Sequence, residues 1–260
     1  MSLLDDEPVL QDELKRERVR IFEDFLSMNS EHFHYKDGVS KMLRQDETRL
    51  VINLDDLRDF NREYADGLLR QPMEFLPAFD EALLETVKLV YDPDKHDLTE
   101  KGYKVGFSGS FGDHHVNPRT LRATHISKMI SVEGIVTRCS LVRPKMTRSI
   151  HFCPETSLFH AREYRDATTS TSNLPPTSSL TPQTDDDGHA LEMEFGHSTF
   201  RDHQRISIQE MPERAPAGQL PRSVDVILDD DLVDKCKPGD RIQLVGIYRS
   251  VGGGGGGGFK

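Results

Sequence analysis

Residues 202–226 read DHQRISIQEMPERAPAGQLPRSVDV, and this stretch decides the fold of the second half of the chain. Apolar and polar residues alternate at 206–208 and again at 224–228, a period of two that is typical of half-buried β-strands. The connection between them, residues 209–222, contains three prolines and one glycine. Prolines reduce the conformational freedom of the unbound loop, and loops of this length in compact domains are usually functional. The sequence therefore predicts two strands joined by a stiff, functional loop.

The same alternation of apolar residues occurs at three other places in the second half of the chain. Its positions are Ile130, Val132, Gly134 and Val136; Met146, Ile150 and Phe152; and Ile242, Leu244, Gly246 and Tyr248. The sequence thus predicts five short strands bounded by turn residues. Five strands of this size can close a small barrel such as the OB-fold, which commonly binds single-stranded nucleic acid. Alternation alone does not distinguish such a barrel from a small sandwich.

The first half of the chain has the periodicity of helices. Apolar residues recur every three to four positions within 14–26, 55–69 and 77–91, which predicts three helices. A short strand is predicted at 50–52, and residues 92–118, which are rich in Gly, Asp and His, are predicted to form a linker. The fold class predicted from these patterns is α+β, with a helical bundle followed by a β-rich domain.

The cysteines and the N-terminus restrict the class of protein. Cys139, Cys153 and Cys236 are odd in number and widely spaced, so we expect no disulfide framework and an intracellular location. The first 17 residues contain acidic groups and no apolar run, unlike a signal or transit peptide. No stretch approaches the roughly 20 apolar residues that a membrane span needs, so we expect no membrane partner.

Residues with metal or catalytic chemistry are few. His151, Cys153 and His160 lie close in sequence, but Thr156 occupies the second position of a C-x-x-C pair and no other cysteine pair follows. A structural zinc site takes four such ligands, so we predict no metal ligands. The glycine run at 252–258 is not followed by the Lys-Ser/Thr of a phosphate-binding loop. We therefore predict no catalytic residue in this chain.

Charge is distributed unevenly along the chain. The net charge is −11, yet the acidic excess lies within residues 1–118, and residues 134–154 contain four basic residues and no acid. A local basic strip matters more for nucleic-acid binding than the total charge. The predicted nucleic-acid-binding residues are Arg138, Arg143, Lys145 and Arg148, with Arg201 and Arg205 on a facing strand.

A solvated strand face is the alternative explanation of this basic strip. Arg148 in particular falls on the same side of its strand as the apolar Met146, Ile150 and Phe152, so the alternative at this position is a partly buried, paired arginine.

Several motifs in the second half resemble the N-terminal region of the minichromosome maintenance (MCM) replicative helicases. They are ISVEGIVTR at 130–138, VRPK at 142–145, QEMPE at 209–213, AGQLPRSVDV at 217–226, and LDDDLVD with KPGD within 228–240. The order and spacing of the motifs match across nearly all of residues 119–250. The helical half is similar in size and type and has no diagnostic motif.

The resemblance implies an N-terminal helical bundle followed by a five-stranded OB-fold barrel with a degenerate zinc-ribbon-like insert. The implied divisions are a helical subdomain with linker at 1–118, the OB-fold at 119–149 and 196–251, the insert with its Ser/Thr/Pro-rich tip at 150–195, and a Gly-rich joint at 252–260, truncated before an ATPase. Only Cys153 remains of the four usual ribbon cysteines, so zinc is not expected. The DNA-facing hairpin of the family is expected after Arg249, where this sequence turns to glycine.

The resemblance also implies a function, that of the ring-forming, DNA-binding tier of a replicative helicase subunit in the nucleus. The implied partners are DNA of either strandedness without sequence preference, the other MCM subunits in a heterohexameric ring, and replication loading and fork factors. ATP and magnesium are implied for the parent protein only. The loop that communicates with the ATPase tier corresponds to Gln209, Glu210, Pro212, Glu213, Gly218, Gln219, Leu220, Pro221 and Arg222. A stand-alone OB-fold single-strand-binding protein and a protein-binding adaptor are the alternatives.

Overall fold

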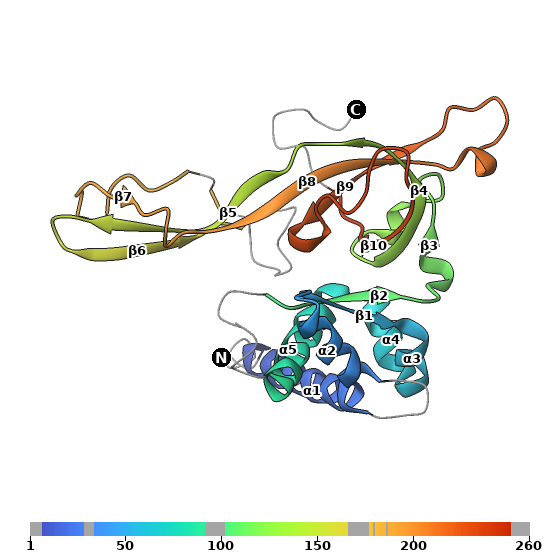
Figure 1. The fold of residues 1–260 in the computed structure, drawn as a ribbon, viewed down its shortest axis with the longest axis horizontal. Helices are drawn as coiled ribbons and strands as arrows, with labels where there is room; N and C mark the ends of the chain where they lie inside the picture. Colours follow the sequence, from blue (N-terminus) through green and yellow to red (C-terminus); the bar gives the residue numbers. More distant parts are fainter. Residues whose placement is uncertain are drawn as a thin grey trace. The chain divides into compact units, whose positions relative to one another are not determined.

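The computed structural model describes residues 7–28, 34–91, 102–165, 177–178, 180–185 and 187–250 (Figure 1). The chain divides into two compact units, residues 1–133 with 243–248, and residues 134–242 with 249–260. Within the described ranges, no helix is long and apolar enough to cross a membrane. The Gly-rich joint predicted at 252–260 and residues 166–176, 179 and 186 of the insert lie outside the described residues.

The first unit is built on five helices and a small parallel sheet. The helices are α1 (Glu7–Ser27), α2 (Tyr35–Arg44), α3 (Leu54–Phe60), α4 (Arg62–Arg70) and α5 (Pro72–Val90). Strand β1 (Arg49–Asn53) pairs in parallel with β2 (Lys104–Ser108). The core is aromatic: the rings of Phe22 and Phe79 stack at 3.8 Å between centroids, and both side chains are fully buried.

Three details of this unit differ from the sequence prediction. The helix predicted at 55–69 is interrupted at Asn61, whose side chain accepts hydrogen bonds from the backbone N–H groups of Glu63 and Tyr64 and so caps α4. Asn is a preferred N-cap residue, so the break follows from local chemistry. Helix α2 is additional to the three predicted helices, and part of the predicted linker at 92–118 forms β2.

The second half of the chain forms a β-sheet. Its strands are β3 (His115–Val116), β4 (Met129–Cys139), β5 (Arg143–Cys153), β6 (Leu158–Glu163), β7 (Glu192–Met193), β8 (Thr199–Gln209), β9 (Ser223–Asp229) and β10 (Arg241–Ile247). Short 3₁₀ turns lie at η1 (Gly112–His114), η2 (Ala123–His125), η3 (Pro212–Arg214) and η4 (Asp230–Leu232). All five predicted strands are present, as β4, β5, β8, β9 and β10.

The strand order is β10-β4-β8-β5-β6, with β3 paired to β4, β7 to β5 and β9 to β8. Among the described residues this path stays open, so the sheet differs from the predicted closed barrel. Strands β6 and β7 extend one end of β5 into an arm, which we define as residues 148–163 and 192–198 (Figure 1). The α+β class is confirmed, and the zinc-ribbon-like character of the insert stays a prediction.

Gly134 permits β4 to approach the end of β8 closely. A Cβ atom at this position would lie 2.5 Å from the carbonyl oxygen of Gln209 and would also overlap the side chain of Ile208. Gln209 is the last residue of β8 and the first of the proline-rich loop. The glycine therefore fixes the place where that loop leaves the sheet.

Replacing Gly134 by Ala is expected to lower the free energy of unfolding by about 1–3 kcal/mol, the usual cost of overpacking a well-packed site. Urea unfolding followed by circular dichroism measures this. Gly246→Ala is the matched control, because a Cβ there meets its nearest neighbour, Leu244, at an ordinary 3.6 Å. Equal stabilities of the two variants would contradict the close approach.

Candidate nucleic-acid interface

Strand β8 places its basic residues on one side of the sheet. Arg201 and Arg205 are four positions apart and therefore share a face, whereas Gln204, Ile206 and Ile208 are buried on the other face. Directly opposed residues in antiparallel strands also share a face. The register between β8 and its neighbours thus decides which other basic residues join Arg201 and Arg205.

Two neighbouring strands contribute to this face. In β5, Arg143 is opposite His203 and Lys145 is opposite Arg201. In β4, Arg138 is opposite Ser207. His203 and Ser207 alternate in phase with Arg201 and Arg205, so the register brings the predicted basic residues of three strands onto the same face.

Arg148 lies on this face too, contrary to the expectation that it is partly buried. The register between β5 and β8 shifts between Met146 and Arg148, so that Arg148 is opposite Thr199. This extra residue moves Arg148 from the side of Met146 to the side of Lys145. Its side chain is exposed. We call the six residues Arg138, Arg143, Lys145, Arg148, Arg201 and Arg205 the basic face.

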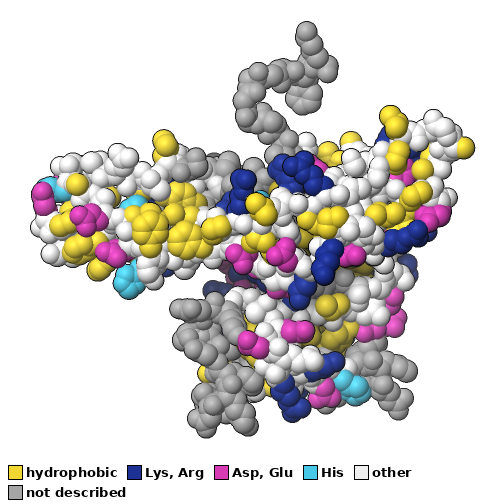
Figure 2. All heavy atoms as spheres, turned by 45° about the horizontal axis from the view of Figure 1, so that its top comes forward, with side chains coloured by type: hydrophobic (Ala, Val, Ile, Leu, Met, Phe, Trp, Pro, Cys, Tyr) yellow, Lys and Arg dark blue, Asp and Glu magenta, His cyan; other side chains and the backbone are white. Residues whose placement is uncertain are grey.

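The basic face is partly neutralised at one point. Arg201 forms ion pairs with Asp229 at 3.7 Å and with Asp230 at 3.6 Å, and His203 contacts Asp229 at 2.9 Å. Lys145 is half-buried, whereas Arg138, Arg143, Arg148 and Arg205 are exposed. Figure 2 shows Lys and Arg side chains gathered over the β5 and β8 part of the molecule, with Asp and Glu side chains among them.

A small hollow lies between two of the exposed arginines. It has a volume of about 210 Å³ and is lined by Arg138, Ser140, Arg205, Ile206, Ser207 and Asp225. Guanidinium groups and hydroxyls are donors suited to phosphate oxygens. The carboxylate of Asp225 repels an anion in this hollow. A phosphate bound there would therefore be held mainly by Arg138 and Arg205.

The base of the proline-rich loop is anchored. The backbone N–H of Glu210 donates to the carbonyl of Arg222 at 2.9 Å, and the side chain of Glu210 is buried. Glu213 forms an ion pair with Arg241. A backbone hydrogen bond, followed by the contact with Arg241, lowers the pKa of the Glu213 carboxyl. Pro212 begins the 3₁₀ turn η3 at this end of the loop.

The tip of the loop is a turn exposed to solvent. The N–H of Gln219 donates to the carbonyl of Pro216 at 3.2 Å, and Gly218 has a φ of +77°, which glycine adopts without strain. Leu220 is 89% exposed, and Gln219, Pro221 and Arg222 are exposed as well. The loop therefore combines a fixed base with an accessible apolar and polar tip.

Comparisons with known proteins match both halves of the chain. The MCM N-terminal domain matches residues 19–109, and the MCM OB domain matches residues 115–252. The chain belongs to the MCM family. The predicted resemblance is thereby confirmed.

Similar MCM proteins carry one name in several organisms. DNA replication licensing factor mcm3 of Schizosaccharomyces pombe is 54% identical over 94% of this chain and 28% of the relative. DNA replication licensing factor MCM3 of Gallus gallus is 50% identical over 92% of this chain and 29% of the relative. The maternal DNA replication licensing factor mcm3 of Xenopus laevis is 48% identical over 93% of this chain and 29% of the relative. This chain therefore spans less than a third of the length of these relatives. The segments HFCPET at 151–156 and DLVDKCKPGD at 231–240 resemble the third MCM subunit most, in agreement with these names.

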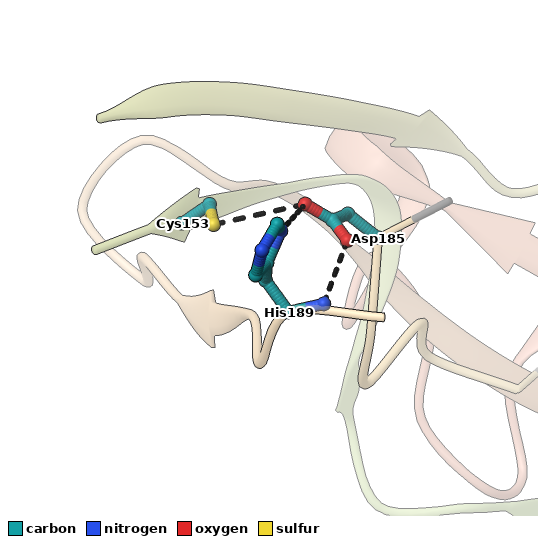
Figure 3. Close-up of side chains that lie close together, drawn as sticks. All are labelled: Cys153, Asp185 and His189. Atoms are coloured by element: carbon teal, nitrogen blue, oxygen red, sulfur yellow. Dashed lines mark hydrogen bonds and ion pairs between the residues drawn. The ribbon is translucent and has the colours of Figure 1, made fainter. Parts of the chain in front are cut away.

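The insert between β5 and β8 contains a cluster that the sequence does not predict. One ligand-type atom each from Cys153, Asp185 and His189 lies within 4.8 Å of the others (Figure 3). The Nδ1 of His189 is 3.1 Å from Asp185 Oδ2, the His189 N–H donates to Asp185 Oδ1 at 2.8 Å, and the Cys153 thiol contacts Asp185 Oδ2 at 3.8 Å. Cys153 is more than 30 positions away from the other two residues in sequence, so no spacing motif indicates the cluster.

The cluster does not match the donor set of a structural zinc site. Such a site takes four ligands, and within the described part of the chain only these three donors come together. Both ring nitrogens of His189 are engaged by carboxylates, since Nε2 is 3.2 Å from Glu155 Oε2. His151 and His160 lie outside the group, each with one buried ring nitrogen that has no hydrogen-bond partner. We therefore describe Cys153, Asp185, His189 and Glu155 as a hydrogen-bonded clasp.

The clasp shifts two pKa values in opposite directions. Hydrogen bonding to Asp185 raises the pKa of His189. Burial acts to raise the pKa of Asp185, but the hydrogen bonds from His189 outweigh it, and the pKa is lowered. By linkage, the Asp185 contribution is present above the ordinary carboxyl pKa of 3.8 and is lost as pH falls below it. The His189 contribution is present below 6.5 and is lost as pH rises through the raised pKa.

In the Asp185→Asn variant, the pKa of His189 is expected to fall toward its ordinary value, because the amide carries no charge to stabilise the imidazolium. Titration of the His189 ring by NMR measures this in both proteins. Glu155→Gln is the control, with a smaller decrease, because the hydrogen bond to Asp185 is the larger cause. An unchanged His189 pKa, or a His189 that does not titrate in a chain with stoichiometric zinc, would contradict the clasp.

Proposed function

We propose that this chain is the N-terminal, ring-forming and DNA-binding tier of a subunit of an ATP-dependent replicative DNA helicase. It acts in the licensing, initiation and fork unwinding of DNA replication in the nucleus by encircling DNA and coupling it to an ATPase tier. The observation that carries the proposal is the basic face, which collects six cations from three strands on one side of an MCM OB domain. The names of the similar licensing factors support the process.

The partners follow from this role. They are single- and double-stranded DNA, the other MCM subunits in a heterohexameric ring, and replication loading and fork factors. No membrane is among the proposed partners. ATP and magnesium act in the parent protein, and this chain functions without zinc because the clasp holds the insert together. The role of the chain itself is to position DNA, and the chemistry belongs to the ATPase of the parent protein.

The basic face binds DNA through phosphates. Cations spaced along strands contact backbone oxygens and carry no sequence information, so binding is sequence-independent and weakens with salt. The total charge of −11 opposes the approach of DNA to a single chain. A ring multiplies the contacts and raises the effective concentration of each basic face.

The proline-rich loop couples this tier to the next. Its base is fixed by the backbone hydrogen bond between Glu210 and Arg222 and by the Glu213–Arg241 ion pair, whereas residues 216–221 and the side chain of Arg222 are exposed. A displacement of a neighbouring tier that pushes on the tip is thus transmitted to the end of β8, which also carries the basic face.

Reversing Arg143 and Lys145 to Glu is expected to reduce the slope of log affinity against log salt. On single strands the reduction is about 0.7 for each phosphate that the variant no longer neutralises. Fluorescence anisotropy with a labelled oligonucleotide at several salt concentrations measures it. Reversal of Lys235 and Lys237, two exposed lysines between β9 and β10, changes the total charge equally and is the control. If both variants have the same slope as the unaltered chain, the DNA path does not follow β5.

Replacing Gln219 or Arg222 by Ala in the full-length protein is expected to uncouple ATP consumption from unwinding. Folding stability should change by no more than about 0.5 kcal/mol, because both side chains lie at an exposed tip. The ratio of strand separation to ATP hydrolysed is the measurement. Lys235→Ala serves as the control for an exposed residue outside the loop. Normal unwinding per ATP in both loop variants would exclude the proposed role of the tip.

A further inference from the structure

Two phenylalanines lie side by side on the arm. Phe152 of β5 is opposite Phe159 of β6, and their ring centroids are 5.1 Å apart. Phe152 is half-buried, whereas Phe159 is 62% exposed and its ring meets the ring of His197 edge-on at 6.1 Å. Burying a phenylalanine in a core stabilises a protein by about 1.5–3 kcal/mol. Pairing with β5 keeps the ring of Phe159 exposed and without this stabilisation, so core packing does not explain its presence.

The two rings continue the line of the basic face. From Arg148 the even positions of β5 lead to Ile150 and Phe152 on the same side, about 13 Å along the strand. The odd positions Ser149, His151 and Cys153 are buried on the other side. Figure 2 shows hydrophobic side chains gathered on the arm beside Lys and Arg side chains on the same face.

We infer that Phe152 and Phe159 form a stacking platform for the unpaired bases of a single-stranded nucleic acid whose phosphates lie along the basic face. Single-strand-binding surfaces combine a basic groove for the backbone with aromatic rings for successive bases. In a duplex the bases are already stacked on one another, so the platform favours single strands. The inference rests on the proposed function, because the basic face must hold the backbone.

The charges around the rings sharpen this assignment. Glu163 is opposite Arg148 and Glu192 is opposite Phe152, so both carboxylates are on the side of the rings. They make this end of the arm unattractive to phosphates. Binding at the rings must therefore come from base stacking, and it depends on the presence of bases rather than on backbone charge.

The test compares two labelled oligonucleotides of equal length, an oligothymidylate and an abasic strand with the same backbone, by fluorescence anisotropy at low salt. The 260-residue chain is expected to bind the oligothymidylate at least about five-fold more tightly, the lower limit for one stacked base. Phe159→Ala and Phe159→Leu should each remove this preference and leave abasic binding unchanged. Phe159→Tyr, which keeps the ring, should retain it.

Leu158→Ala is the matched control, because Leu158 is 59% exposed on the same strand but on the opposite side. It should bind both strands like the unaltered chain. Salt-sensitive binding of both oligonucleotides without preference would overturn the platform and leave the proposed function standing. A loss of preference in Leu158→Ala equal to that in Phe159→Leu would also overturn it. Absence of binding to either strand would overturn both proposals.

Discussion

The register of strand β8 is the constraint on which the β-rich half of the molecule depends. One edge of β8 pairs with β4 and β5, and the other pairs with β9. Its inward side is fixed by burial of Ile206 and Ile208 and by Gln204, whose amide bonds to the Ser140 carbonyl and to Asp234. A slip by one residue would turn Ile206 and Ile208 to solvent and bury the basic residues of the other face in their place, so this register is strongly specified.

The same register explains how an acidic chain can present a basic surface. The excess of carboxylates lies in residues 1–118, and the carboxylates of β9 are partly used by Arg201 and His203. What remains exposed on the outer side of β4, β5 and β8 is mostly arginine. At moderate salt, charges farther than a Debye length of about 8–10 Å from a phosphate are largely screened. The local arrangement of arginines therefore affects DNA binding more than the net charge of the whole chain does.

Much of the fold can be predicted because it follows from periodicity. All five strands with clear alternation are present, and the three periodic segments of the first half are helical. Helix α2 escapes the prediction, although Val39, Met42 and Leu43 have helical spacing and are buried. The break between α3 and α4 has a local signal, because Asn61 is a preferred N-cap residue. The apolar periodicity runs on through Asn61, however, and so predicts one continuous helix.

The site is less predictable, because side-chain direction and distant partners depend on tertiary structure. Alternation alone places Arg148 on the side of Met146, whereas the register shift separates the two, and such a shift cannot be read from one strand. The partners of Cys153 lie beyond a segment without a spacing rule, so the sequence gives no sign of the clasp. The exposure of Phe159 depends in the same way on β6 pairing with β5.

The most direct test of the account is the face from which DNA is contacted along β5. A photoreactive amino acid is placed in turn at Lys145, Met146 and Arg148, and crosslinking to a single-stranded oligonucleotide is measured. The account predicts efficient crosslinks from Lys145 and Arg148 and few from Met146, because the register shift puts the first two on one side. Crosslinks from Met146 as efficient as those from Lys145 and Arg148, or none from Arg148, would contradict it.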